Sequence, residues 1–340
     1  MPSFSRLGLE LSPVVFGCMG LPHLSPSVRL RLIHCAIDHG ITSFDTAPLY
    51  GAGESERILG AALGGRRGDV QILTKCGVRW DSDHGQPMFE MWLDEKLWTV
   101  RKDSRPDSVR GEIEASLRRL KTETIDLLQV HQLDAQVPVE DVMETLERAR
   151  AAGKVRAIGV SNYPVPELRR AQAALAGRLC TTQNRCNALQ WSASSAVVEL
   201  AVEHGIGVLA YEPLARGILA GKALAGGGDF GCSERALRRV DRALRDVALP
   251  IAAAHGITLA QLSLAWLLAR PGLSAVIAGA STEAQVGDNA RAAAVTIDAA
   301  ALEAFGRALA ACRFAPRERA PLKMRLMQRV RRLVRKLRGR

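Results

Sequence analysis

The stretch TSFDTAPLYGAGESERILGAAL, residues 42–63, indicates how this chain folds. Its first part, Thr42–Thr46, has the pattern of a short buried strand, and Glu54–Leu63 carries apolar residues at helical spacing. A strand followed directly by a helix is the repeating unit of parallel α/β folds. This stretch therefore predicts such a fold.

The same alternation recurs along most of the chain. Eight strand-like runs, most of them followed by an amphipathic helical pattern, imply parallel pairing and right-handed crossovers. Eight such units close a barrel, so we predict a single α/β domain, a (β/α)8 TIM barrel, over residues 1–312. The predicted strands are Val14–Gly17, Thr42–Thr46, Gln71–Cys76, Asp126–His131, Ala157–Asn162, Thr181–Asn187, Val208–Glu212 and Ser274–Gly279. The predicted helices include Ser27–His39, Glu54–Leu63, Pro106–Leu120, Val139–Ala152, Pro164–Ala176, Ala193–His204 and Leu259–Ala269.

Three segments interrupt this alternation. Residues Phe4–Leu11 alternate around a Gly and predict a short N-terminal hairpin. The long loop Gly77–Arg105, after the third strand, holds three of the five Trp residues. A loop of that length is usually a functional lid or binding loop; the alternative is a solvent-facing excursion with a small core of its own. In Ala223–Cys232, a run of glycines permits a mobile flap after the seventh strand.

The net charge of +11 is concentrated at the end of the chain. Residues 313–340 hold 12 Lys or Arg and one acidic residue, which leaves 34 basic and 34 acidic residues in 1–312. This neutral body has no electrostatic footprint for nucleic acid, so we expect no sequence-specific nucleic-acid partner. We therefore divide the chain into the barrel, 1–312, and a basic amphipathic C-terminal extension, 313–340.

Composition and cysteine usage favour a globular cytoplasmic protein. Hydrophobic residues make up 47% and charged residues 24% of the chain. The seven cysteines include no CxxC pair and no metal-type spacing, so we expect reduced thiols and no metal site. No apolar run is long enough to span a bilayer, and the N-terminus shows no export signal.

Four residues with acid–base chemistry lie at or near the ends of predicted strands. Asp45, Lys75 and His131 each stand at the carboxyl end of a strand, and Tyr50 lies in the loop after the first of them. The ends of successive parallel strands converge on one rim of a barrel, where barrel enzymes keep their chemistry. We therefore expect these four side chains to share one pocket.

Together these side chains form a plausible device for delivering a proton to a carbonyl oxygen. Tyr is a poor acid at neutral pH, but a nearby ammonium lowers its pKa, and a carboxylate keeps that ammonium charged. Tyr50 would then be the general acid/base, and His131 would polarise or position the same oxygen. Singly, each residue has a simpler explanation, as a helix cap, a core histidine or a packed ring. Their coincidence at three strand ends favours catalysis.

The sequence resembles the aldo-keto reductase family over nearly all of residues 4–312. FDTAPLYGAGESERILGAAL is similar to the family's segment around its catalytic Asp and Tyr, while ILTK and DLLQVH supply the Lys and His. RPDSVRGEIEASLRRLKTETIDLLQVH, GKVRAIGVSNY and VLAYEPLARGILAGK also match in order and register. The resemblance implies an NAD(P)-dependent oxidoreductase that acts on an aldehyde, ketone or sugar carbonyl, or on the matching alcohol. Its catalytic residues would be Asp45, Tyr50, Lys75 and His131.

The resemblance also implies a nicotinamide dinucleotide, NADP or NAD, bound without a Rossmann domain; no GxGxxG opens a strand–helix unit here. Ser161, Asn162 and Gln183 would hydrogen-bond the carboxamide, and Tyr211 would stack on the nicotinamide ring. An ordinary helix cap is the alternative for Ser161 and Asn162. The positions that match the pyrophosphate channel and the adenosine-phosphate segment are Leu214, Gly217, Leu219, Gly279, Ser281, Gln285 and Asn289.

Two departures from the family pattern bear on the coenzyme. Many relatives carry Lys or Arg at the positions of Gly279, Ser281 or Gln285, and a 2′-phosphate favours such cations, so the choice between NADP and NAD stays open. The Ser281 backbone N–H, at a helix start, could still bind an anion. Glu212 brings a carboxylate towards the phosphate channel, where it would repel phosphate unless it points away or pairs with Arg216.

The substrate pocket would lie above Tyr50 and His131, walled by Trp80, the long loop and Trp191. The sequence names no particular small-molecule carbonyl or alcohol, and it does not decide the direction of the reaction or the oligomeric state. Two other functions use the same residues. One is a low-turnover nucleotide-binding regulatory or scaffold barrel tethered to a membrane or partner by its basic tail. The other is a sugar oxidoreductase that works in the oxidative direction.

The end of the chain, PLKMRLMQRVRRLVRKLRGR, predicts a basic amphipathic helix. Its apolar side chains form one stripe, and the other faces are almost purely cationic. Such a helix suits weak contact of residues 322–340 with an anionic membrane at its inner face. An acidic partner, the phosphates of nucleic acid, or a solvated extension without a role are the alternatives.

Overall fold

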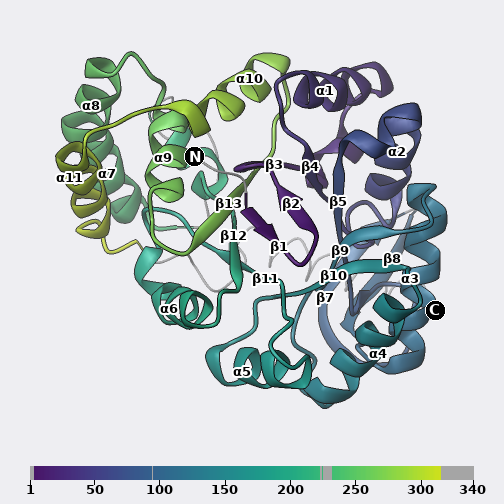
Figure 1. The fold of residues 1–340 in the computed structure, drawn as a ribbon. Helices are drawn as coiled ribbons and strands as arrows, with labels where there is room; N and C mark the ends of the chain where they lie inside the picture. The colour runs from purple at the N-terminus through teal and green to yellow at the C-terminus, as the bar shows by residue number, and fades with distance from the viewer. Residues whose placement is uncertain (1–3, 94, 223, 225–231, 315–340) are drawn as a thin grey trace, which may run out of the picture.

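Eight parallel strands form a closed barrel around which the helices are arranged (Figure 1). The computed structural model describes residues 4–93, 95–222, 224 and 232–314. Neighbouring strands follow the order of the chain, and the last one pairs with the first. The barrel strands are β3 (Val14–Gly17), β4 (Ser43–Asp45), β5 (Gln71–Cys76), β9 (Ile125–Val130), β10 (Val155–Ser161), β11 (Thr181–Arg185), β12 (Gly207–Tyr211) and β13 (Leu273–Ala278). The predicted barrel and its eight strands are confirmed.

Most barrel strands are followed by a helix that packs on the outside. The helices are α1 (Pro26–Asp38), α2 (Glu54–Leu63), α3 (Pro106–Leu120), α4 (Val139–Ala151), α5 (Val165–Ala174), α6 (Ser195–Glu203), α7 (Glu234–Ala243), α8 (Leu249–Ala254), α9 (Leu259–Leu268), α10 (Glu283–Arg291) and α11 (Ala299–Ala310). Figure 1 shows α7, α8 and α11 gathered at one side of the ring. The predicted glycine flap, residues 223–232, lies almost entirely outside the described residues, as does the basic tail from residue 315.

Helix α3 shows how the sequence sets both the limits and the packing of an element. Pro106 occupies the first turn, where its missing N–H costs nothing, and the helix ends at Lys121 in a left-handed conformation. Val109, Ile113 and Leu120 lie on its buried face. Gly60 of α2 lets the two helices approach closely, because a Cβ there would lie 2.5 Å from the Leu120 carbonyl oxygen.

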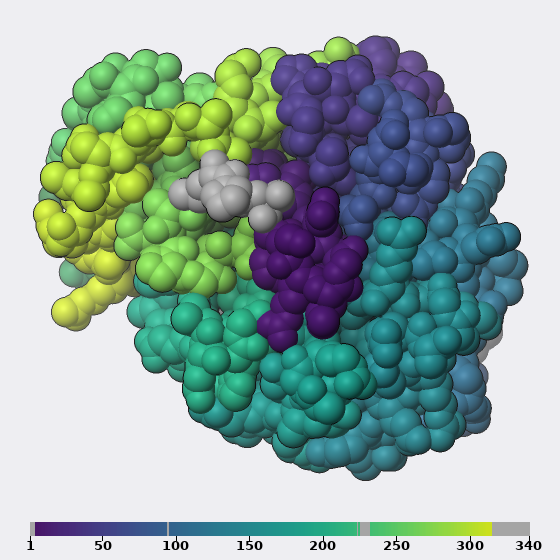
Figure 2. Space-filling model, viewed as in Figure 1, coloured from purple at the N-terminus to yellow at the C-terminus, as the bar shows by residue number. Residues whose placement is uncertain are grey.

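A short hairpin closes the amino-terminal end of the barrel (Figure 2). Its strands are β1 (Phe4–Arg6) and β2 (Leu9–Leu11), as the sequence predicts. Leu9 and Leu11 are fully buried against the apolar side chains that fill the barrel interior. Gly207, at the start of β12, makes room for the Phe4 ring, since a Cβ there would lie 2.5 Å from that ring. The predicted catalytic residues Asp45, Lys75 and His131 lie at the opposite end, at or just after the carboxyl ends of their strands.

The long segment after β5 forms an antiparallel arm. The sequence predicts a loop, but three strands form a sheet here: β6 (Val78–Arg79), β7 (Gln86–Leu93) and β8 (Lys96–Lys102), in the order β6-β8-β7. The pattern misses them because a register shift between Pro87 and Phe89 breaks the alternation and because β7 is largely exposed on both faces. The arm begins at Gly77, which has a φ of 82°.

A buried carboxyl lies beneath the base of this arm. Glu112 of α3 accepts a hydrogen bond from the Gly77 N–H at 2.9 Å, and its other oxygen has no hydrogen-bond partner among the described residues. Burial raises the pKa of Glu112 to about 8; the Gly77 N–H and Arg79 oppose this rise, while Asp81 and Asp103 add to it. The carboxyl therefore keeps its proton at neutral pH.

This proton makes the stability of the protein depend on pH in a specific direction. Between the unfolded pKa near 4.3 and the folded pKa, the folded state binds one more proton than the unfolded state, so stability falls as pH rises from about 5 to about 8. We expect Glu112→Gln to remove this loss, which amounts to roughly 4 kcal/mol in the free energy of unfolding. Urea titrations at both ends of that range measure it. Glu114→Gln, on the same helix but half exposed, is the control; equal pH dependence in wild type and Glu112→Gln contradicts the assignment.

No single helix in the described part of the chain is long and apolar enough to cross a membrane. Two helical segments that meet at 84°, Glu234–Ala254 and Leu259–Leu268, reach the required length and composition only as a bent pair.

Candidate active site

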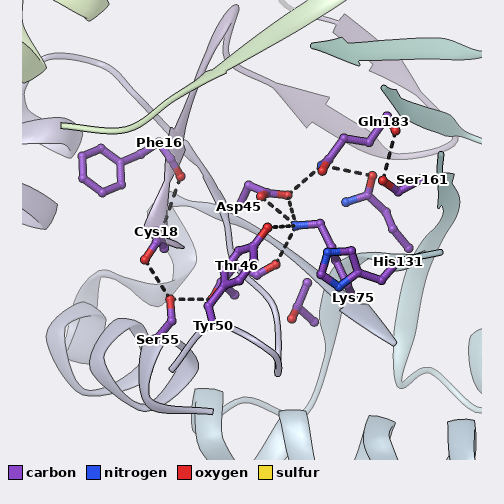
Figure 3. A network of polar contacts seen from close by, with 12 residues as sticks. Phe16, Cys18, Asp45, Thr46, Tyr50, Ser55, Lys75, His131, Ser161 and Gln183 are labelled. Atoms are coloured by element: carbon purple, nitrogen blue, oxygen red, sulfur yellow. Dashed lines mark hydrogen bonds and ion pairs between the residues drawn. The ribbon is translucent and has the colours of Figure 1, made fainter. Parts of the chain in front are cut away.

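Three strand ends and one loop bring the four predicted catalytic residues together at the open mouth of the barrel (Figure 3). Asp45 ends β4, and Lys75 is the last residue but one of β5. His131 follows β9, and Tyr50 lies in the loop that leads to α2. These four side chains lie close together, as the sequence predicts, and their catalytic role stays a prediction.

Lys75 is the centre of this cluster. Its ammonium donates to the two carboxylate oxygens of Asp45, at 2.9 and 2.7 Å, and to the Thr46 carbonyl at 2.9 Å. The Tyr50 hydroxyl lies 3.3 Å from Nζ. Because the side chain of Lys75 is fully buried, its charge is tolerated only through these partners.

The loop that carries Tyr50 is held by its own hydrogen bonds. The Tyr50 N–H donates to the Ala47 carbonyl at 3.1 Å, and the Tyr50 carbonyl accepts from the Ser55 N–H at 3.2 Å. The hydroxyls of Thr46 and Ser55 lie 2.8 Å apart, and Ser55 donates to the Cys18 carbonyl at 3.0 Å (Figure 3). The phenol is therefore attached to a rigid backbone.

Burial and charge act in opposite directions on the Tyr50 phenol. Burial raises the pKa of Tyr50, Lys75 lowers it, and the net result is a pKa above the usual value. The expectation of a lowered pKa is wrong, because loss of hydration outweighs the neighbouring ammonium. Burial alone would lower the pKa of Lys75, but Asp45 and Tyr50 together raise it. At neutral pH the phenol is protonated and the ammonium is charged.

His131 faces Tyr50 edge-on, with ring centroids 5.9 Å apart and ring planes at 85°. Burial and, next, the Lys75 ammonium lower the pKa of His131 well below its usual value, so the imidazole is neutral. The backbone N–H of His131 donates to the Cys76 carbonyl at 2.8 Å, and the backbone carbonyl of His131 accepts from the Asn162 side-chain amide at 3.2 Å. A neutral imidazole retains one ring N–H with which to donate to a substrate oxygen.

The predicted carboxamide-binding side chains form a second cluster beside the first. Ser161 Oγ donates to the Gln183 carbonyl at 3.0 Å and accepts from the Asn162 amide at 2.9 Å. The Tyr211 hydroxyl donates to Asn162 Oδ1 at 2.8 Å. The helix-cap alternative is wrong, because Pro164 is the N-cap of α5 and no side chain caps it.

A hydrogen bond through Gln183 connects the two clusters. Its amide nitrogen donates to Asp45 Oδ1 at 2.8 Å (Figure 3), so Asp45 is held from one side by Lys75 and from the other by Gln183. Gln183 is buried, with 2% of its surface exposed. The sequence alone does not reveal this link, because the two residues are far apart along the chain.

The predicted pyrophosphate segment forms a tight turn after β12. Leu214 precedes the turn Ala215–Ala220, and Gly217 has a φ of 92° within it. Leu219 is fully buried in the core, so its side chain cannot line a channel. L side chains rarely adopt such a positive φ, so any substitution of Gly217 would be strained.

The predicted adenosine-phosphate residues lie at the start of α10. The Ser281 N–H, expected to be available to an anion, donates to Gln285 Oε1 at 2.8 Å, and the Ser281 hydroxyl donates to the same oxygen at 3.0 Å. An anion would have to displace Gln285. Asn289 is buried and donates to the Gly279 carbonyl at 3.4 Å.

Glu212 is ion-paired with two arginines, so its negative charge is compensated. One oxygen lies 3.4 Å from Arg216 Nε, as the sequence suggests, and the other lies 3.0 Å from Arg185 Nε. Sequence reasoning did not single out Arg185. The signal was present, because Arg185 follows Gln183 by two residues on one strand and therefore leaves the same face.

The two predicted substrate-pocket tryptophans lie in different surroundings. Trp191 packs edge-on against Trp266 of α9, with centroids 5.8 Å apart. Trp80 follows β6 at the base of the arm and is partly buried. Their role as substrate walls stays a prediction. Within the described ranges, no group of three or more His, Cys, Asp or Glu is arranged to hold a metal ion.

A closed (β/α)8 barrel whose open mouth gathers a Tyr, a Lys, an Asp and a His is the architecture of a barrel enzyme with acid–base chemistry. Comparison with known proteins identifies the family. The chain matches the model of the Aldo/keto reductase family over residues 13–309, and it belongs to that family of NAD(P)-dependent oxidoreductases.

Three relatives illustrate the range of the similarity. The chain is 31% identical over 309 residues to an uncharacterized oxidoreductase, YrpG, of Bacillus subtilis, covering 86% of this chain and 90% of that protein. It is 33% identical over 274 residues to a probable aldo-keto reductase of Glycine max, covering 77% and 75%. It is also 30% identical over 314 residues to a probable voltage-gated potassium channel subunit beta of Arabidopsis thaliana, covering 85% and 90%.

Solved structures agree with the fold. A glycerol dehydrogenase from Gluconobacter oxydans superposes with a TM-score of 0.80 at 27% identity, covering 92% of this chain and 96% of that one. An aldo-keto reductase from Bacillus halodurans gives a TM-score of 0.72 at 27% identity, covering 89% and 93%.

Proposed function

We propose that this protein transfers hydride between a nicotinamide coenzyme and an aldehyde, ketone or sugar carbonyl, or the matching alcohol, with Tyr50 as general acid/base. The contact of Tyr50 with a buried, charged Lys75 carries this proposal, with 3.3 Å between the hydroxyl and Nζ. The Asp45 carboxylate keeps this buried ammonium charged, and a charged ammonium in contact with a phenol is suited to stabilising the phenolate that proton transfer leaves.

The residues at the mouth fit a nicotinamide coenzyme. Ser161, Asn162 and Gln183 present polar groups beside the Tyr211 ring, which offers an aromatic face. Arg185 is ion-paired with Glu212 through Nε, and its two terminal amino groups donate to no acceptor among the described residues, which leaves donors for an anionic group. When bound, the coenzyme supplies the hydride. The proposal names NADP or NAD, since the residues at Gly279, Ser281 and Gln285 provide no cation for a 2′-phosphate.

In the reductive direction, side chains of the protein hold the proton and transfer it. Tyr50 holds it at neutral pH and gives it to the carbonyl oxygen as negative charge develops there. The phenolate left behind is stabilised by Lys75, whose charge is secured by Asp45. His131, neutral and edge-on to Tyr50, donates its ring N–H to the same oxygen.

A second candidate is a nucleotide-binding regulatory or scaffold barrel with little turnover, and the similarity to the probable potassium channel subunit of Arabidopsis thaliana favours it. The basic extension would then deliver the barrel to a membrane or partner; contact of residues 322–340 with an anionic membrane lies outside the described residues and stays a prediction, as does a cytoplasmic location.

A carbonyl and alcohol screen with both coenzymes separates these functions. We expect wild-type protein to oxidise NADH or NADPH in the presence of several aldehydes, ketones or sugars, measured as loss of coenzyme absorbance. Because the screen runs in both directions, it also separates a reductase from a sugar dehydrogenase. Tight coenzyme binding without turnover across a broad panel would instead support the scaffold.

A further inference from the structure

A compact ion-pair cluster stands at the barrel mouth beside Tyr211. Arg185 is the last residue of β11, Tyr211 is the last residue of β12, and the two are paired in register. The Glu212 carboxylate lies between two guanidinium groups, 3.0 Å from Arg185 Nε and 3.4 Å from Arg216 Nε. One negative and two positive charges leave the cluster cationic.

The guanidinium of Arg185 adjoins the site that the proposed function assigns to coenzyme and substrate. Side chains two residues apart on a strand leave the same face, and Gln183 reaches Asp45 inside the barrel. Arg185 therefore lies on the inner face, one layer nearer the opening. Its Cζ is 5.6 Å from the centroid of the Tyr211 ring, and 37% of its side chain is exposed.

Arg185 also has unused hydrogen-bonding capacity. Its Nε is buried and makes no hydrogen bond of good geometry, although it is ion-paired with Glu212. Among the described residues, its two terminal amino groups donate to no acceptor. A partly exposed guanidinium whose two terminal amino groups are without acceptors has the geometry for two-point binding of phosphate or carboxylate.

We propose that Arg185 is an anion-binding residue of this site, and that it takes up an anionic group of a ligand seated against Tyr211. Glu212 holds the guanidinium in place until the anion arrives and competes with that anion for it. This inference rests on the proposed function. The anion has two possible sources, the diphosphate of the coenzyme or a carboxylate or phosphate on the carbonyl substrate, and experiment separates them.

The first arm uses inorganic pyrophosphate and needs neither coenzyme nor turnover. We expect pyrophosphate to raise the thermal midpoint of the full-length protein, and we expect Arg185→Gln to weaken its apparent affinity roughly 10- to 100-fold, as loss of a charged hydrogen bond implies. Glu212→Gln should strengthen pyrophosphate binding, because a competing charge is removed. If the Arg185–Glu212 pair had a purely structural role, both variants would bind pyrophosphate more weakly than the wild type.

The second arm identifies the source of the anion. Fluorescence titration gives the Kd for NADH and NADPH, and steady-state rates compare 4-carboxybenzaldehyde with its neutral methyl ester. If Arg185 binds the diphosphate, both coenzyme Kd values rise roughly 10- to 100-fold in Arg185→Gln. The ratio of the rate with the acid to the rate with the ester is then unchanged. If it binds substrate, only the KM for the acid rises. Arg185→Lys should lie between wild type and Arg185→Gln, since a point charge keeps attraction but loses the fork.

Arg148→Gln, which removes an exposed arginine of α4 that is also ion-paired, is the matched control. The proposal is overturned if a folded Arg185→Gln protein stays within about twofold of wild type in all three measurements: pyrophosphate affinity, coenzyme Kd and the acid-to-ester ratio. A wild-type protein that binds pyrophosphate through Arg185 but turns over no carbonyl contradicts only the proposed function.

Discussion

Replacing Tyr50 by Phe is expected to lower kcat for carbonyl reduction by roughly 10²- to 10⁴-fold, the usual range for losing a positioned general acid. The ring remains, so its edge-on contact with His131 and its place in the loop are retained. Stopped-flow and steady-state rates with whichever coenzyme the screen selects would measure the loss. Coenzyme Kd should change by less than about twofold, because the substitution removes one hydroxyl and keeps the ring.

The pH dependence sharpens this test. Since burial holds the pKa of Tyr50 above its usual value, the phenol is already in its acid form throughout the neutral range. Wild-type reduction governed by this group should therefore vary little at neutral pH and decline only in alkali. A Tyr50→Phe protein that keeps wild-type kcat would show that the proton comes from another group.

Lys75→Met is expected to lower the free energy of unfolding by roughly 3–5 kcal/mol, because it leaves the buried Asp45 carboxylate without its ammonium. The side chains of Lys75 and Asp45 are 0% and 4% exposed, so water cannot replace the lost partner. Guanidinium or urea denaturation at pH 7 measures the change. The variant should also lose carbonyl reduction, since a Tyr50 phenolate would form beside no positive charge.

The double variant Asp45→Asn with Lys75→Met separates these two effects. An Asn at this position still offers an oxygen to the Gln183 amide, which donates to Asp45 Oδ1 at 2.8 Å in the wild type. Most of the lost stability should return, because no unpaired charge remains, whereas activity should not. A single Lys75→Met variant as stable as wild type would mean that the pair is not the buried ion pair that the geometry indicates.

Pattern alone predicts the parts of the fold in which local and global preferences agree. Four elements have the predicted limits: the strands Val14–Gly17 and Gln71–Cys76 and the helices Glu54–Leu63 and Pro106–Leu120. In these elements the hydrophobic pattern begins and ends where the element does. The arm was missed because its strands depend on pairing with each other and bury little. Helix α7, ERALRRVDRA, is not among the predicted helices, although its buried residues Ala236 and Val240 recur at helical spacing.

For the candidate site, too, some features could be predicted from the sequence and others could not. Asp45, Lys75 and His131 could be placed because the topology puts all strand ends on one rim. What the sequence could not provide is contact between side chains distant along the chain, such as the bond from Gln183 to Asp45 or the pair of Arg185 with Glu212. Nor does it reveal how strongly burial acts on a phenol.

The hairpin Phe4–Leu11 affects how ligands can enter and leave the barrel. Leu9 and Leu11 fill one end of the barrel, so in the described part of the chain a small molecule would reach the strand ends from the other side. In the proposed reaction, coenzyme and substrate would therefore enter by the same route, and the one that lies deeper would bind first and leave last.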